Sequence, residues 1–205
     1  MIDICRWLVD VPGMRMVPLF AADETGVVSV KITGDRTLLR RSETMEQAVI
    51  EIVEHGLEDP DWVGLLYVMG WGTSEAFRIL YVGKAERRGV SRPLSANLEN
   101  IRKNKHKFAR WGDGVAYHIG DLSHAMFEFK AYRRPSAKYR HWASTLFVTN
   151  QPPRLREAVT LALLPWYRHS RGPSGLTSSL PAAEKEVIAL AGTRFGSGFL
   201  NRDGI

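Results

Sequence analysis

Two tyrosines, Tyr67 and Tyr81, lie near the ends of two short apolar segments, and a basic segment directly follows the second one. Farther along, Arg102 and His106 are four residues apart, a spacing that places two side chains on one face of a helix. Phenol, imidazole and guanidinium groups can transfer a proton and neutralise the charge of a phosphate. Their concentration in one stretch indicates phosphodiester hydrolysis as the chemistry.

The elements that would hold these side chains can be predicted from composition and spacing. Segments 64–69 and 78–83 are rich in Leu, Val, Ile and Tyr and predict two antiparallel strands. The glycine-rich sequence at 70–74 predicts the hairpin connection between them. A helix is predicted from residue 93 to about residue 107, which would bring Arg102 and His106 close to the hairpin.

This stretch resembles the GIY-YIG nucleases over roughly residues 62–168. The first tripeptide of that family corresponds to GLLY at 64–67, and the second corresponds to YVGKA at 81–85. Arg102 and His106 match the arginine of the family and the histidine that follows it by four residues. Their larger distance from the second tripeptide is similar to the restriction-type members, which insert a basic loop here.

The resemblance implies a role for each of these residues. Tyr67 would take a proton from water, Tyr81 and His106 would orient the water or the phosphate, and Arg102 would contact the phosphate, with Arg92 as an alternative arginine. An ordinary phenol has a pKa near 10, so we expect the pKa of Tyr67 to be lowered by about three units. Lys84 and the arginines after it are the cations predicted to lower it.

Two glutamates compete for the divalent cation, Mg²⁺ or Mn²⁺, that the resemblance implies. Glu157 lies on a helix predicted from about 154 to 164, with Pro165 after it, and this helix would follow the last strand of the sheet. Glu184 lies on a C-terminal helix in a sequence that ends in Asn201, which is also similar to the end of the family. The distance from the second tripeptide favours Glu157, which we therefore predict to be the metal ligand.

The charge of the chain suggests a polyanionic partner. Lys and Arg number 28 against 22 Asp and Glu, which gives a formal net charge of +6 and a pI of about 9.6. The residues predicted to contact nucleic acid are Lys84, Arg87, Arg88, Arg92, Arg133 and Arg134. Arg110 and Trp111 could also stack on a nucleic acid. His118, in a strand predicted at 115–119, is interpreted as a core residue.

The predicted fold is α/β in the α+β sense, with a small, mainly antiparallel sheet flanked by helices. A single domain is expected, whose GIY-YIG-like core covers residues 62–168. Residues 1–60 would form an N-terminal elaboration with a strand at 26–32 and a helix at 45–55. Residues 169–205 would form a C-terminal loop and helix.

The single cysteine, Cys5, excludes an internal disulfide and a cysteine-based zinc site, and it fits a reducing compartment. No apolar run approaches the roughly 20 residues of a membrane span, and the N-terminus shows no cleavable signal pattern. We therefore expect a soluble, cytoplasmic protein without a membrane partner.

The expected activity is that of a metal-dependent endonuclease, similar to restriction enzymes, acting on double-stranded DNA. A twofold homodimer would suit the cutting of both strands of a palindrome. One alternative is a non-catalytic nucleic-acid-binding protein on a degenerate GIY-YIG fold, and another is an unrelated basic α+β scaffold.

Overall fold

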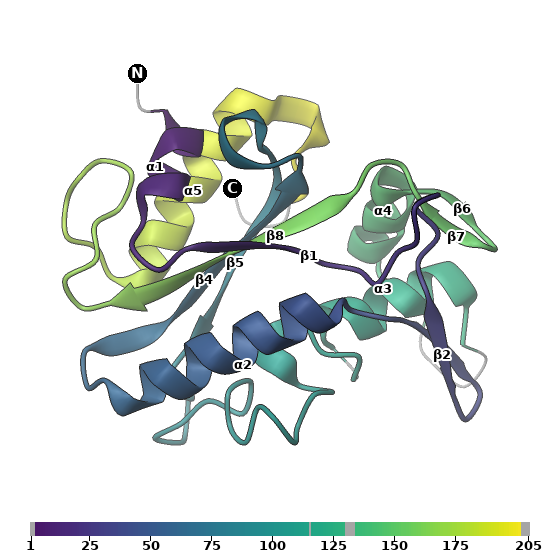
Figure 1. Ribbon diagram of the computed structural model, residues 1–205, viewed down its shortest axis with the longest axis horizontal. Helices are drawn as coiled ribbons and strands as arrows, with labels where there is room; N and C mark the ends of the chain where they lie inside the picture. Colours follow the sequence, from purple (N-terminus) through teal and green to yellow (C-terminus); the bar gives the residue numbers. More distant parts are fainter. Residues whose placement is uncertain (1–2, 115, 130–133, 202–205) are drawn as a thin grey trace.

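The computed structural model describes residues 3–114, 116–129 and 134–201, and a four-stranded antiparallel sheet forms its centre (Figure 1). The strand order is β1-β8-β4-β5. The four strands are β1 (Arg15–Pro18), β4 (Trp62–Trp71), β5 (Arg78–Glu86) and β8 (Val159–Tyr167). Two hairpins form separate small sheets, made of β2 (Val30–Thr33) with β3 (Arg36–Leu39) and β6 (Phe147–Asn150) with β7 (Pro153–Leu155). The predicted fold class is confirmed.

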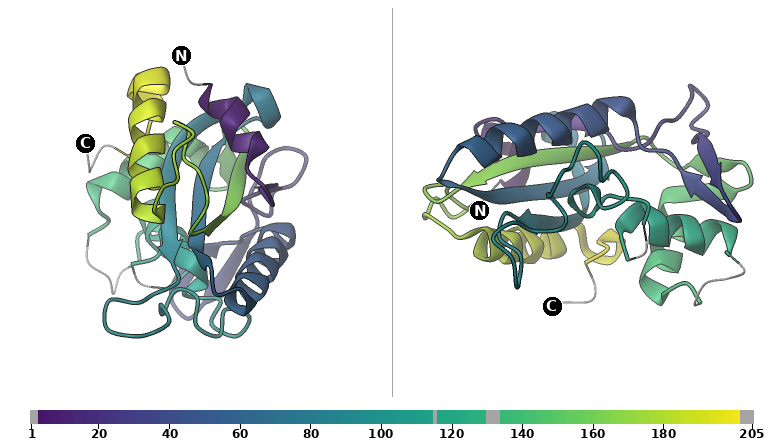
Figure 2. Two further views of the ribbon diagram at one scale, coloured as in Figure 1. Left: turned by 90° about the vertical axis from the view of Figure 1, so that its left-hand side faces the viewer. Right: turned by 90° about the horizontal axis from the view of Figure 1, so that it is seen from below.

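Helices cover both faces of the central sheet. They are α1 (Ile4–Asp10), α2 (Glu43–Glu58), α3 (His118–Phe127), α4 (Ala137–Leu146) and α5 (Leu180–Phe195), with short 3₁₀ turns at Ser74–Ala76, Phe108–Arg110 and Gly196–Gly198. One apolar cluster joins one face of the sheet to α2, α3 and α4, and a second joins the opposite face to α1 and α5. Figure 2 shows the sheet between α2 on one side and α5 on the other.

Helix α2 forms where apolar side chains recur at helical spacing, and it runs longer than the predicted 45–55. The Ser42 hydroxyl accepts a hydrogen bond from the Met45 N–H at 3.0 Å and caps the N-terminus. The helix ends before Pro60, as expected.

The predicted hairpin is confirmed as β4 and β5. In its register Tyr67 lies opposite Gly83, and Met69 lies opposite Tyr81. A Cβ atom at Gly83 would lie 2.6–2.7 Å from atoms of the Tyr67 ring. The glycine is therefore required because the Tyr67 ring lies directly against the backbone of β5.

The helix predicted at 93–107 is wrong, because this stretch consists of turns. Asn100 has a left-handed backbone with φ of 49°. Ser95 Oγ accepts a hydrogen bond from the Asn97 N–H, and the Asn104 amide donates to the Glu99 carbonyl. Such local side-chain bonds compete with the backbone ladder of a helix.

Two further predictions fail. The stretch from 154 to 164 forms β7 and β8 instead of a helix, because its apolar run fills a central strand with β4 on one side and β1 on the other. An unbroken apolar run has the same appearance in a buried strand and in a buried helix. The strand predicted at 115–119 is also wrong, since Ala116 has φ of 62° and α3 begins at His118.

Gly83→Ala is expected to lower the free energy of unfolding by about 3 kcal/mol, because the added methyl group overpacks the Tyr67 ring. It should also change the near-ultraviolet circular dichroism, which reports the packing of aromatic rings. Gly34→Ala is the control, because its Cβ would meet no atom within 4 Å and only its φ of 61° is unfavourable, at about 1 kcal/mol. Urea unfolding measures both changes. Equal losses with unchanged spectra would contradict the close approach.

Candidate functional site

The tyrosines predicted to do chemistry come together on the face of the sheet that α3 and α4 cover. The ring centroids of Tyr67 and Tyr81 are 6.4 Å apart. Both rings are buried, with 2% of Tyr67 and 8% of Tyr81 exposed. Trp111 and Trp142 complete the wall, with ring centroids 5.5 Å from Tyr67 and 4.6 Å from Tyr81 respectively.

A chain of hydrogen bonds runs from Tyr67 to a second phenol through His118. The Tyr67 hydroxyl lies 3.1 Å from His118 Nε2, and His118 Nδ1 lies 2.8 Å from the Tyr139 hydroxyl. Burial, together with the positive charges of Lys138 and Arg110, holds the pKa of His118 well below its ordinary value. His118 is therefore a neutral imidazole, with one nitrogen that donates and one that accepts.

Two cations from the segment between β5 and β8 lie beside these rings. The Lys138 ammonium lies over the rings of Tyr81, Trp142 and Tyr139, at 5.0, 5.5 and 5.7 Å from their centroids. The Arg110 guanidinium lies 5.2 Å from the centroid of the Tyr117 ring. Among the described residues, Arg110 has no partner in an ion pair or a side-chain hydrogen bond.

The carboxylate at this site is Glu184 on α5. Its side chain is partly buried and forms an ion pair with Lys84 at 3.5 Å. Burial raises the pKa of Glu184, and the positive charge of Lys84 opposes that change. The negative charge of Glu184 contributes to the raised pKa values of Tyr81 and Tyr67, although α5 covers the opposite face of the sheet.

The chain after α5 closes the outer edge of β5 next to Tyr81. The Asn201 side chain accepts a hydrogen bond from the Val82 N–H at 2.8 Å and donates one to the Val82 carbonyl at 2.7 Å. The Leu200 N–H donates to the Leu80 carbonyl at 2.7 Å. These contacts occupy backbone groups that an edge strand otherwise leaves open.

The pKa of Tyr67 is raised, against the prediction, and the pKa of Tyr81 is raised as well. Burial raises the pKa of Tyr67 well above its ordinary value, and the charge of Tyr81 adds to this while Arg110 opposes it. Burial also raises the pKa of Tyr81 to about 12, with a smaller contribution from Glu184. Lys84, predicted to lower the pKa of Tyr67, is opposite Leu66, whose side chain packs on the other face of the sheet.

Three of the predicted catalytic residues lie elsewhere. Arg102 forms an ion pair with Glu54 on α2 at 2.7 Å, and His106 is exposed on the turns after it. Glu157 is exposed in the turn before β8. Glu157 lies six residues before Leu163, the strand partner of Tyr67, and six residues of extended chain span roughly 20 Å.

The predicted nucleic-acid contacts divide into several groups. The Arg87 guanidinium is used within the fold, since it donates to the carbonyls of Leu57, Asp59 and Trp62. Lys84 pairs with Glu86 at 3.1 Å as well as with Glu184, and Arg92 pairs with Glu99 at 3.7 Å. Arg88 and Arg134 are exposed, whereas Arg133 lies outside the described residues.

Sequence reasoning missed Arg110 and His118 as partners of the tyrosines. Arg110 was considered only for stacking, and His118 was assigned to a strand. Glu184 was present in the sequence as the alternative carboxylate, with Asn201 as the signal that accompanies it. The structure places Glu184 and Asn201, and not Glu157, in contact with β5, through Lys84 and Val82.

The described residues contain no group of three or more His, Cys, Asp or Glu side chains arranged to hold a metal ion. A dedicated protein cage is therefore not present in that part of the chain. Mg²⁺ is commonly held by one or two carboxylates, with water and phosphate oxygens as its other ligands. The partly buried Glu184 carboxylate fits a site of that kind.

No family model, curated protein or solved structure matches this chain. None of the described helices combines the length and the apolar character that crossing a membrane requires.

The free energy of unfolding is expected to fall as the pH rises from about 10 to 12. Tyrosines of the unfolded chain ionise near pH 10, whereas Tyr81 keeps its proton up to about 12 in the fold. The stabilisation is complete below pH 10 and is lost at about 1.4 kcal/mol per pH unit for each protected tyrosine. Tyr81→Phe should reduce the slope of the unfolding free energy against pH by the contribution of one tyrosine, about 1.4 kcal/mol per pH unit. Denaturant unfolding at several pH values measures it, and an unchanged slope in Tyr81→Phe would contradict the assignment.

Proposed function

We propose that this protein is a metal-dependent endonuclease of the GIY-YIG type that hydrolyses phosphodiester bonds of double-stranded DNA. The observation that carries the proposal is the environment of Tyr81. This phenol lies beside Tyr67 on the adjoining strand, Lys138 lies over its ring, and the charges of Glu184 and Arg110 both act on its pKa. Two phenols on one face of the sheet, a lysine over one of them, and an arginine and a carboxylate whose charges reach them form a set that could bind and cut a phosphodiester.

The residues of this site take the roles that the resemblance had implied for others. Arg110 replaces Arg102 as the guanidinium for the phosphate, because its donors are not engaged within the described part of the chain. Glu184 replaces Glu157 as the metal ligand. Mg²⁺ or Mn²⁺ held there would neutralise charge on the phosphate and stabilise the leaving oxygen.

The raised pKa of Tyr67 sets a condition on its role as a base. Tyr67 can accept a proton from water only if its own hydroxyl proton moves away, and His118 Nε2, 3.1 Å away, is the acceptor in place. Both pKa shifts oppose this transfer, because the pKa of Tyr67 is raised and the pKa of His118 is lowered, so His118 would hold the proton only briefly, with its Nδ1–H donated to the Tyr139 hydroxyl. Because the pKa of His118 is held low, the imidazolium is a strong acid that readily gives the proton back.

A second candidate function, nucleic-acid binding without cleavage, is favoured by the burial of the site. Tyr67 is almost completely covered by the cluster around Trp111 and Trp142. Glu184 is already neutralised by Lys84. A binding protein would use the exposed cations of the same region and would leave these groups as parts of the core. A single, buried cysteine, Cys5, fits a cytoplasmic location for either function.

Glu184→Gln is expected to reduce Mg²⁺-dependent cleavage of plasmid DNA by about 100-fold or more, the effect of removing one electrostatic contact to the transition state. Glu157→Gln is the matched control and should cleave like the unmodified protein, because its carboxylate lies in the exposed turn before β8. Agarose gels with Mg²⁺ and with a chelator measure nicking. If no preparation cuts DNA or RNA with any divalent metal, the binding function replaces the enzyme.

Arg110→Ala should reduce cleavage by a similar factor, because it removes the guanidinium assigned to the phosphate. Arg102→Ala is the control, since its side chain pairs with Glu54 on the exposed side of α2. The control is expected to change the cleavage rate less than twofold and to leave stability almost unchanged, because an exposed ion pair contributes little. If Arg102→Ala lowers the cleavage rate more than Arg110→Ala does, Arg102 has the catalytic role instead.

A further inference from the structure

Two hairpins that are far apart in the sequence meet at one end of the molecule. The segment before β2 pairs with β7, through hydrogen bonds from Val28 N–H to the Pro153 carbonyl and from Leu155 N–H to the Gly26 carbonyl, both 2.8 Å long. Figure 1 shows β2, β6 and β7 at the end of the protein remote from α1 and α5. We call the pair β2–β3 and β6–β7 the two-hairpin end.

The outer strands of the two-hairpin end are covered by little of the protein. All four residues of β2 are exposed, although its sequence alternates apolar and polar side chains. Ile32 is 79% exposed and Val148 on β6 is 55% exposed. In an ordinary half-buried strand the apolar side would face a core. These apolar side chains therefore face a surface that a partner can cover.

The charge of the two-hairpin end identifies the kind of partner. Segments 30–40 and 147–156 together carry five basic residues and one acidic residue, a net charge of +4. They are Lys31, Arg36, Arg40, Arg154 and Arg156, with Asp35 as the acid, and the charge of Lys31 is balanced by Asp113 outside these segments. Exposed Thr33 at the tip adds a hydroxyl group of a kind that hydrogen-bonds to base edges, whereas Thr149 and Asn150 donate to the carbonyls of Pro152 and Met126. Basic, polar and apolar side chains on a two-stranded ribbon match a groove of duplex DNA better than a protein surface.

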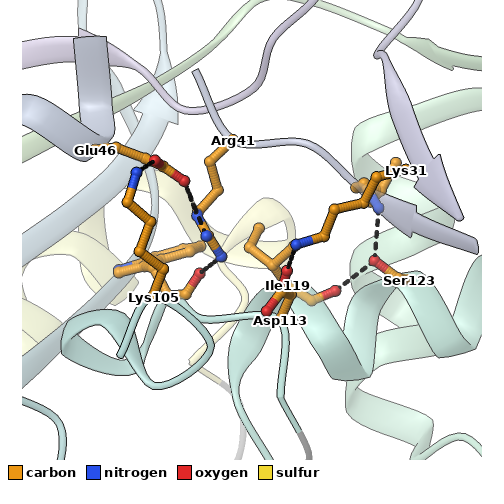
Figure 3. A network of polar contacts seen from close by, with 9 residues as sticks. Lys31, Arg41, Glu46, Lys105, Asp113, Ile119 and Ser123 are labelled. Atoms are coloured by element: carbon orange, nitrogen blue, oxygen red, sulfur yellow. Dashed lines mark hydrogen bonds and ion pairs between the residues drawn. The ribbon is translucent and has the colours of Figure 1, made fainter. Parts of the chain in front are cut away.

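Polar contacts fix the β2–β3 hairpin to the elements of the candidate site (Figure 3). Lys31 pairs with the buried Asp113, two residues after Trp111. The Leu39 N–H donates to Ser123 Oγ at 3.0 Å, and that hydroxyl donates to the Ile119 carbonyl at 2.6 Å within α3. A displacement of the hairpin would therefore also move α3 and the loop that contains Asp113.

The base of the hairpin is held by a second, buried part of the network. Arg41 donates to the Trp111 carbonyl at 3.2 Å and pairs with Glu46 of α2 at 2.9 Å. Glu46 also pairs with Lys105. Figure 3 shows Arg41 beside Glu46. Because Arg41 also contacts the carbonyl of Trp111, the residue after Arg110, it holds the base of the hairpin at a fixed distance from that part of the chain.

We propose that the β2–β3 hairpin is a DNA-reading arm that enters a groove of the duplex while β6–β7 lies along the backbone beside it. The major groove is about 12 Å wide and admits a two-stranded ribbon. Thr33 and Arg36 pair across a two-residue turn, Gly34 and Asp35, so the tip is narrow. Ile32 contacts base methyl groups, and the network of Figure 3 sets the distance from the bases to the phosphate at Arg110. The arm rests on the proposed function, because duplex DNA is its ligand.

An iron–EDTA cutting experiment tests the arm. Asp35→Cys places a thiol at the exposed tip, and Leu176→Cys places one on the 71% exposed loop before α5 as a control. The natural Cys5 is 2% exposed and stays unlabelled. Each variant is conjugated to iron–EDTA and mixed with end-labelled plasmid fragments without Mg²⁺. The Asp35→Cys conjugate should cut the bound duplex at discrete positions, and the Leu176→Cys conjugate should not.

Each outcome separates the arm from the proposed function. The arm is overturned if the protein retards DNA in a gel but the Asp35→Cys conjugate does not cut it, or if both conjugates cut it equally. The endonuclease proposal survives both results. No retardation at low salt overturns both. Discrete cutting by the conjugate in a protein that never cleaves DNA itself supports the arm and overturns the enzyme.

A second variant tests recognition. Ile32→Ser removes an exposed apolar side chain without opening the core, and it should change the distribution of cleavage sites on a plasmid, with about tenfold loss at the preferred ones. An unchanged distribution overturns the reading role. The reading role is also overturned if the protein sediments as a dimer without DNA and Ile32→Ser converts it to a monomer, because the hairpin would then contact a second copy of the chain.

Discussion

The contact between the Tyr67 ring and the bare backbone of Gly83 determines the arrangement of the site. It holds the ring flat on β5 and directs the hydroxyl toward His118 at the start of α3. His118 in turn fixes α4 through the Tyr139 hydroxyl. A buried imidazole between two phenols satisfies polar groups that would otherwise be costly at this depth. The missing Cβ atom of Gly83 therefore allows the hydrogen bonds that link Tyr67 to both helices, which also pack on the sheet through their apolar side chains.

The sheet also separates charges that the sequence places together. Lys84 directly follows the second tripeptide and Tyr67 ends the first, on two paired strands, but alternate residues of a strand point to opposite faces. Lys84 therefore joins Glu184 on the side of α5, whereas Tyr67 lies under α3. Tyr81 is on the edge strand, where the charges of both layers reach it. Chemistry that needs both a carboxylate and the phenols must take place at this edge.

The sequence predicted best where a pattern is local. The hairpin, α2 and the C-terminal helix follow from apolar periodicity and turn residues, and all three are confirmed. The stretch at 93–107 failed because Ser95, Asn97 and Asn104 bond to nearby groups instead of supporting a helix. The apolar run of β8 failed because its neighbours β1 and β4 come from distant parts of the chain. Burial reversed the expected change in the pKa of Tyr67, and burial is a property of the whole fold.

The candidate site is composite, because its side chains come from separate parts of the chain. The strands that hold Tyr67 and Tyr81 and the helix that holds Glu184 belong to the sheet and its covers. The cations Arg110 and Lys138 come from the long segment between β5 and β8, which also supplies β6 and β7. The N-terminal segment is bound to this insertion by Arg41, through the carbonyl of Trp111. The parts that would hold a phosphate and the parts that would select the DNA are therefore one mechanical unit, distinct from the sheet that carries the phenols.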